Sequence, residues 1–199
     1  MPIHSDTLFP RLKADRSHEI YHLDMGRHMF ARLSDDNPTA ISMVSVPMLE
    51  DLEVQFAHDQ SEGHALVSRA DLLEEEGWDE MAMIQHAFRN LKEKLGEDLK
   101  LSTLENDLIR LFAGGKYDAS FLLLSNLWLK LEEDYGANLY AATPSQNLLL
   151  IGRQDDRRAI LQLQRMIRGV FFDADRDSLL SKAVYQRFDG QWVIVATAF

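Results

Sequence analysis

The sequence predicts an α+β protein with a mostly antiparallel sheet that is built from hairpins and covered by three main helices. Short apolar runs occur in pairs around turn residues, which is typical of antiparallel hairpins. Three longer segments repeat apolar residues at helical spacing. No strand is followed by the glycine-rich loop and helix of a dinucleotide-binding unit, so a Rossmann-type parallel sheet is not predicted.

The first and third helices each have one apolar face. The first is predicted over residues 77–96, where Asp79 can accept hydrogen bonds from first-turn amides and Gly96 ends the helix. The third is predicted over residues 155–169, with Gly169 at its end. The residues expected to face inward are Ile84, Phe88, Leu91, Leu95, Ile160, Leu163 and Ile167.

The second helix is predicted over residues 114–136 and is the expected core helix. Asp118 is the expected N-cap, and Gly136 is the expected end. Apolar residues cover most of its circumference, so we expect burial on more than one side. Its main stripe is Phe121, Leu124, Trp128 and Leu131, widened by Leu122, Leu123, Leu127 and Leu129.

The strands are expected as hairpins. Pro47 is expected to end the second strand, because proline cannot donate to a ladder. Pro144 is the expected turn of the third pair, and an Asp-Gly turn joins the last pair. The four predicted pairs are 28–33 with 40–46, 99–104 with 108–113, 138–142 with 147–152, and 183–188 with 191–196.

The N-terminal third of the chain is harder to interpret. Residues 1–17 are polar and mixed, and we expect a short helix or arm there. Residues 48–66 are acidic, and a helix with a loop near Gly63 is the interpretation favoured for them. We expect residues 1–65, an arm and a hairpin, to be part of the same fold as an α+β core formed by residues 66–199.

Composition narrows the classes of function. The chain has no cysteine, which excludes disulfides, thiolate metal sites and thiol nucleophiles. The N-terminal residues contain no apolar segment typical of a signal peptide, and the apolar runs are too short to cross a bilayer. These features predict a cytoplasmic protein that does not associate with membranes, and no motif predicts a cofactor.

The net charge of −11 is concentrated in one segment. Residues 50–80 hold eleven acidic residues and one basic residue, a net charge of −10. This segment would repel nucleic acid but could attract a protein partner with a basic surface. The leading hypothesis is therefore a non-catalytic protein-interaction domain of the adaptor, chaperone or toxin-neutralising type. The expected partner-binding residues are Glu50, Asp51, Glu53, Glu74, Glu75, Glu76, Asp79 and Glu80.

A second hypothesis is a zinc-dependent hydrolase. Residues 18–28 contain H-E-x-x-H, which on a helix presents two imidazoles to one zinc ion while the glutamate activates water. The ligands would be His18, His22 and His28, with Glu19 as the base. However, Met25 occupies the position where such a turn needs glycine, and the surrounding residues show no helical stripe. No catalytic residues are therefore assigned, and metal binding is kept only as an alternative.

A third hypothesis is a sensor of a small anionic ligand. Four arginines lie on or beside the third predicted helix and are expected to point mostly outward. Guanidinium groups can bind carboxylate or phosphate groups. The candidate anion-binding residues are Arg157, Arg158, Arg165 and Arg168.

An ordered series of four motifs resembles a known family. These are LLEEEGWDEMAMIQHAFRNL, GGKYDAS followed by an aromatic-rich helix, TPSQNLLLI, and LLSKAVYQRFDGQW. Together they make residues 66–199 similar to the YtpQ-like family of uncharacterised bacterial proteins. The family usually has Pro-Ser-Arg-Asp in the third motif, whereas this chain has Gln146 and Asn147 at the charged positions. The resemblance implies no established reaction, and an activity that depends on those charges is not expected here.

Overall fold

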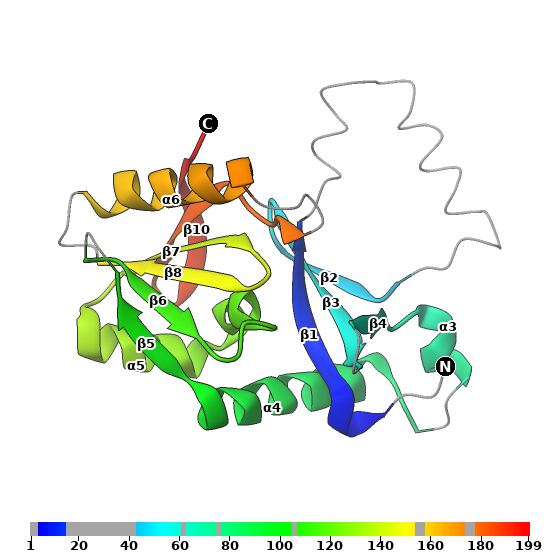
Figure 1. The fold of residues 1–199 in the computed structure, drawn as a ribbon. Helices are drawn as coiled ribbons and strands as arrows, with labels where there is room; N and C mark the ends of the chain where they lie inside the picture. Colours follow the sequence, from blue (N-terminus) through cyan, green and yellow to red (C-terminus); the bar gives the residue numbers. More distant parts are fainter. Residues whose placement is uncertain are drawn as a thin grey trace, which may run out of the picture.

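The protein is an α+β fold with two antiparallel sheets, as the sequence predicts (Figure 1). It was examined as a computed structural model. The structure describes residues 4–14, 43–60, 63–74, 77–104, 107–153, 158–173 and 178–199. The predicted strand at 28–33 lies outside these residues, as does the start of the predicted strand at 40–46.

The smaller sheet is built around one central strand. β3 (Leu52–Asp59) pairs with β1 (Leu8–Ala14) on one side, and with β2 (Ser45–Leu49) and β4 (His64–Leu66) on the other. The expectation of a helix in residues 48–66 is therefore wrong, and most of the described residues at the N-terminus form β1 rather than the expected short helix or arm. The polar residues of β3 interrupt the apolar alternation that would identify a strand in the sequence. Their side chains are nevertheless buried or partly buried in the fold.

β2 also corrects the prediction that Pro47 ends a strand. Pro47 lies inside β2, opposite Glu53 of β3, and its side chain is exposed. β2 is an edge strand of this sheet, where a residue without an N–H can be tolerated. A short 3-10 helix, η1 (Ser5–Thr7), precedes β1, and α3 (Arg69–Glu74) follows β4.

The larger sheet has six strands in the order β10-β9-β7-β8-β6-β5, all antiparallel. It confirms the three predicted C-terminal hairpins. Asp189 and Gly190 form the last turn with φ values of 48° and 77°, as a two-residue hairpin turn requires. The third turn lies at residues 146–147, so the prediction of a turn at Pro144 is wrong. The strands are β5 (Lys100–Thr103), β6 (Ile109–Phe112), β7 (Tyr140–Ser145), β8 (Leu148–Gly152), β9 (Ala183–Phe188) and β10 (Gln191–Thr197).

The first predicted helix is α4 (Glu80–Asp98). Asp79 caps it as predicted, because its carboxylate accepts a hydrogen bond of 2.7 Å from the N–H of Ala82. The helix continues through Gly96, so the prediction that this residue ends it is wrong; glycine inside a helix costs only about 1 kcal/mol. The side chain of Leu95 is outside the described residues. The fully buried apolar residues are Met83, Ala87 and Leu91, while Ile84 and Phe88 are partly buried.

The second predicted helix is in fact two. The 3-10 helix η3 (Asp118–Leu123) leads into α5 (Ser125–Tyr135), and the chain bends at Leu124, whose φ of −90° and ψ of 90° are not helical. α5 ends at Gly136 as predicted. The bend lets both helices contribute to the core. Phe121, Leu122, Leu127, Trp128 and Leu131 are buried, whereas Leu129 is 52% exposed.

The third predicted helix is α6 (Ala159–Asp173). Leu163 and Ile167 are fully buried as predicted, but the helix passes Gly169, which therefore does not end it. The expected caps at residues 155 and 156 lie outside the described residues. A membrane-spanning helix needs about 20 mostly apolar residues, and no helix in the described ranges meets that requirement.

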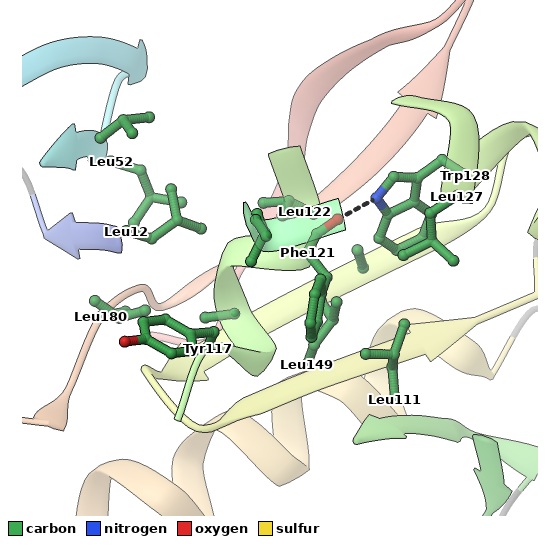
Figure 2. Close-up of a cluster of buried hydrophobic side chains, with 14 of the residues drawn as sticks. Leu12, Leu52, Leu111, Tyr117, Phe121, Leu122, Leu127, Trp128, Leu149 and Leu180 are labelled. Atoms are coloured by element: carbon green, nitrogen blue, oxygen red, sulfur yellow. Dashed lines mark hydrogen bonds between the residues drawn. The ribbon is translucent and has the colours of Figure 1, made fainter. Parts of the chain in front are cut away.

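Both faces of the six-stranded sheet are covered, and adjacent residues of each strand point to opposite sides. Ala142, Leu150 and Val184 pack with α6 in the smaller of two hydrophobic clusters. Their neighbours on the other face belong to the larger cluster, which η3 and α5 share with α4 and the smaller sheet. Figure 2 shows Leu12 and Leu52 of the smaller sheet facing this cluster. One core therefore joins residues from both halves of the chain.

A buried polar contact also joins the two sheets. Asp51, in the turn between β2 and β3, lies beside Tyr185 of β9 and Ser181. The Tyr185 hydroxyl is 2.8 Å from each carboxylate oxygen, and the Ser181 hydroxyl donates to the same carboxylate. Tyr185 and Ser181 are almost fully buried. We call these three residues the Asp51 staple.

We expect Asp51→Ala to lower the free energy of unfolding by about 2 kcal/mol, because two buried hydroxyls would lose their shared acceptor. Urea denaturation measures this change. Glu50→Ala is the matched control: Glu50 is the exposed neighbour in the same turn, and its loss should change stability by less than about 0.5 kcal/mol. Equal effects of the two substitutions would show that the staple contributes little.

Candidate functional site

The predicted acidic surface is divided between two places. Glu50, Asp51 and Glu53 lie at the β2–β3 turn, and Glu74, Asp79 and Glu80 lie at the end of α3 and the start of α4. Figure 1 shows the β2–β3 turn at one end of β3 and α3 beside the other end. The eight residues of β3 span roughly 26 Å at about 3.3 Å per residue. Glu75 and Glu76 lie outside the described residues.

Three of these acids have structural partners. Asp51 forms the staple, and Glu53 accepts a hydrogen bond of 2.8 Å from Gln55. Asp79 caps α4. The exposed carboxylates without such a described role are Glu50 at one end and Glu74 and Glu80 at the other.

The predicted arginine cluster is also split. Arg158 and Arg165 line a shallow pocket of about 380 Å³ with Leu161 and Gln162. Arg168 points elsewhere, and its Nε donates a hydrogen bond of 2.6 Å to the carbonyl of Ala198. Arg168 therefore holds the end of the chain against α6, and Arg157 lies outside the described residues.

The structure leaves the zinc hypothesis as a prediction. His18, Glu19, His22 and His28 are all outside the described residues. Elsewhere in the described part of the chain, no three histidine, aspartate or glutamate side chains gather where they could hold a metal ion.

A pocket of about 440 Å³ that contains a buried arginine lies beside the smaller sheet. Alternation along β1 puts Arg11 and Lys13 on one face, and Gln55 of β3 lies directly opposite Arg11. The larger half of the protein supplies the other wall. The lining residues are Arg11, Leu12, Lys13, Gln55, His64, Leu66, Gln146 and Ser178. We call this the Arg11 pocket.

Arg11 is buried, with 8% of its surface exposed. Its Nη2 donates a hydrogen bond of 2.6 Å to Oε1 of Gln146, in the turn between β7 and β8. Gln146 is fixed by its backbone, which accepts a hydrogen bond from Ala119 and donates one to the carbonyl of Ser178. Burial lowers the pKa of Arg11, while Tyr117 and Asp59 act in the opposite direction. An arginine remains charged at neutral pH all the same.

A glycine turn supports the same region. Asp118 is fully buried, and its Oδ1 accepts hydrogen bonds from the backbone N–H groups of Ala113 at 2.9 Å and Gly115 at 3.1 Å. The expectation that Asp118 caps a helix is therefore wrong: it closes the turn before η3 instead. Burial raises the pKa of Asp118, and the two backbone hydrogen bonds oppose that effect.

The turn positions Lys116 and Tyr117. Lys116 forms an ion pair with Asp59, the last residue of β3. Tyr117 is 3% exposed and stacks on Phe9 with ring centres 4.5 Å apart. The Arg11 guanidinium lies 5.8 Å from the centre of the Tyr117 ring, within the range of a cation–π contact. Burial raises the pKa of Tyr117 strongly, and a hydrogen bond to Asp59 adds to that effect.

His64 adds a titratable group to the pocket. It is exposed at the start of β4, opposite Asp59 in the strand register. Partial burial lowers the pKa of its imidazole, and the positive charges of Arg11 and Lys116 lower it further. Asp59 raises it, but less strongly. These surroundings therefore favour the neutral imidazole.

Sequence reasoning missed this site because β1 was not recognised as a strand. Residues 8–13 do alternate, with Leu8 and Leu12 buried on one face and Arg11 and Lys13 on the other. That pattern was the available signal. Two of the four motifs in the family resemblance meet at the pocket, since GGKYDAS contributes the supporting turn and TPSQNLLLI contributes Gln146.

Comparisons with known proteins give no further assignment. No family model, no curated protein and no solved structure matches the chain. The similarity to the YtpQ-like family therefore stays a prediction.

We expect Tyr117 to weaken the fold at high pH. A folded-state pKa above the unfolded value of about 10 stabilises the protein below pH 10, and this contribution is lost as the pH rises further. Urea unfolding between pH 8 and pH 11 should show that Tyr117→Phe loses less stability than the wild type above pH 10. The difference should approach about 1.4 kcal/mol per pH unit. Parallel declines would show that Tyr117 ionises equally in both states.

Proposed function

We propose that this protein binds a small anionic ligand in the Arg11 pocket. The observation that carries the proposal is the buried guanidinium of Arg11, whose hydrogen-bond partner among the described residues is the neutral amide of Gln146. A buried charge normally has an opposite charge beside it, because removal from water is costly. An anion in the pocket would provide that charge.

The nearby acid does not neutralise Arg11 by direct contact. Asp59 influences the guanidinium from a distance, but its carboxylate forms an ion pair with Lys116. Among the described residues that line the pocket, Arg11 and Lys13 are cationic and none is an aspartate or glutamate. A planar guanidinium can bind two oxygens of one carboxylate or phosphate, which gives both affinity and orientation.

The proposal thus keeps the anionic ligand of the third hypothesis, but it places the ligand in the Arg11 pocket instead of on the third predicted helix. Arg158 and Arg165 are exposed side chains at a pocket on α6, whereas Arg11 is buried where two halves of the fold meet. Desolvation strengthens a charged hydrogen bond, so the Arg11 pocket is the better anion site.

We expect Arg11→Gln to weaken binding of inorganic phosphate by about tenfold or more, because a charge-assisted hydrogen bond is lost. Isothermal titration calorimetry measures the affinity. Arg165→Gln removes an exposed arginine of α6 and serves as the matched control, with an expected change below about twofold. If the Arg165 variant lost binding while the Arg11 variant kept it, the ligand would belong on α6.

A second candidate function is docking of a basic protein partner, as an adaptor, chaperone or toxin-neutralising protein would require. The observation in its favour is at the α3–α4 end, where Leu73 and Met81 are 88% and 61% exposed. They lie near the exposed acids Glu74, Asp79 and Glu80 in the chain. Exposed apolar residues with surrounding acids suit a partner that is both basic and apolar.

We expect the double substitution Glu74→Lys and Glu80→Lys to weaken binding of an amphipathic lysine–leucine peptide by about tenfold, because attraction becomes repulsion. Fluorescence anisotropy with a labelled peptide measures this. Glu50→Lys, at the other end of the smaller sheet, is the control and should have little effect. A similar loss from Glu50→Lys would indicate general charge attraction rather than docking at α3 and α4.

A further inference from the structure

We propose that the ligand of the Arg11 pocket is a phosphate monoester of a small organic molecule, and that His64 becomes positively charged when it binds. This inference rests on the proposed function and specifies its ligand class. Three features of the pocket carry it: the number of cations in its lining, the surroundings of His64, and the pocket's size together with its apolar wall.

The first feature is the charge of the lining. Arg11 and Lys13 lie two residues apart on the same face of β1, and both line the pocket. Glu53 of β3 lies opposite Lys13 in the strand register, and its carboxylate accepts a hydrogen bond from Gln55. A monocarboxylate carries one negative charge and would balance one of these cations. A phosphate monoester carries a charge near −2 at neutral pH and balances both. Its three terminal oxygens also provide enough acceptors for several donors at once.

The second feature is the set of charges around His64. Arg11 and Lys13 on β1 and Lys116 in the turn before η3 are positive. Asp59 on β3 is negative but pairs with Lys116, and Tyr117 is buried and uncharged. Partial burial lowers the pKa of His64 most, and the charges of Arg11 and Lys116 add to this effect, so the neutral imidazole is favoured. A dianion beside Arg11 reverses the balance of charge at His64 and favours the imidazolium form.

The third feature is the space that remains. The pocket of about 440 Å³ lies within the size range of sites for small organic ligands, which start near 300 Å³. Leu66 of β4 is part of its lining, beside the cations, and is only partly buried. An inorganic anion would leave this apolar wall in contact with water. A phosphate ester would place its charged group at Arg11 and its organic part against Leu66.

The charge of the ligand is tested by calorimetry on the full chain with sulfate, acetate and glycerol 1-phosphate. Sulfate stays a dianion at all pH values used, so its pH dependence reports the protein's own protonation. We expect sulfate to bind at least about tenfold more tightly than acetate at pH 5.5, because two cations are balanced. Glycerol 1-phosphate should bind more tightly than inorganic phosphate at pH 8.0, where both are mainly dianions.

The role of His64 is tested by the same titrations at pH 5.5 and pH 8.0. Since binding takes up a proton, sulfate affinity should fall by about tenfold between these values. His64 is exposed, so His64→Gln should leave the fold intact and remove most of this pH dependence. His86→Gln, which changes a histidine of α4 outside the pocket, is the matched control and should retain it. An unchanged pH dependence in the His64 variant would overturn the proposed role of His64.

The outcomes separate this inference from the proposed function. If acetate binds as tightly as sulfate and Arg11→Gln abolishes the binding of both, the pocket binds anions without a preference for dianions. In that case the inference fails while the proposed function stands. Equal affinities for glycerol 1-phosphate and inorganic phosphate would overturn the organic part of the ligand. If none of the probes binds to the wild type, both the inference and the proposed function fail.

Discussion

The contact between the Asp51 carboxylate and the hydroxyls of Tyr185 and Ser181 fixes how the two sheets meet. The shared apolar core holds the sheets together, but hydrophobic contact has no preferred direction and permits small shifts between layers. The hydrogen bonds to the partly buried Asp51 carboxylate are directional and oppose such shifts. The Arg11 pocket depends on this alignment, because Arg11 and Gln146 come from different sheets and meet only when the sheets are in place.

The C-terminal part of the fold could be predicted from sequence because its signals are local. The three hairpins have apolar runs around short turns, and the helices have caps or stripes within a few residues. β3 could not be predicted in this way. It contains Glu53, Gln55 and Asp59, and these polar residues are accommodated by neighbours far along the chain. Similarly, Asp118 has the appearance of an N-cap, but its Oδ1 accepts hydrogen bonds from backbone N–H groups of the turn that precedes it.

The candidate site could not be predicted from the sequence for a related reason. Arg11, His64 and Gln146 are separated by dozens of residues, and of these three only Gln146 belongs to a motif of the family resemblance. The charge pattern of residues 50–80 was visible, but the sequence could not show that Asp51 would be used inside the fold or that β3 would separate the rest. Clusters of charge along a chain do not imply clusters in space. The motif TPSQNLLLI did indicate an important turn, although not its partner.

The spacing of the strand pairs has a consequence for how the chain reaches this structure. β9 and β10 are joined by a two-residue turn, whereas Leu8 of β1 pairs with His58 of β3, far along the chain. Closing a long loop costs more entropy than closing a short one, and contacts between distant residues form slowly. The C-terminal hairpins are therefore expected to assemble early and β1 to join late. A ligand held by Arg11 would then bind only the completed fold and act as a late clamp on its N-terminal strand.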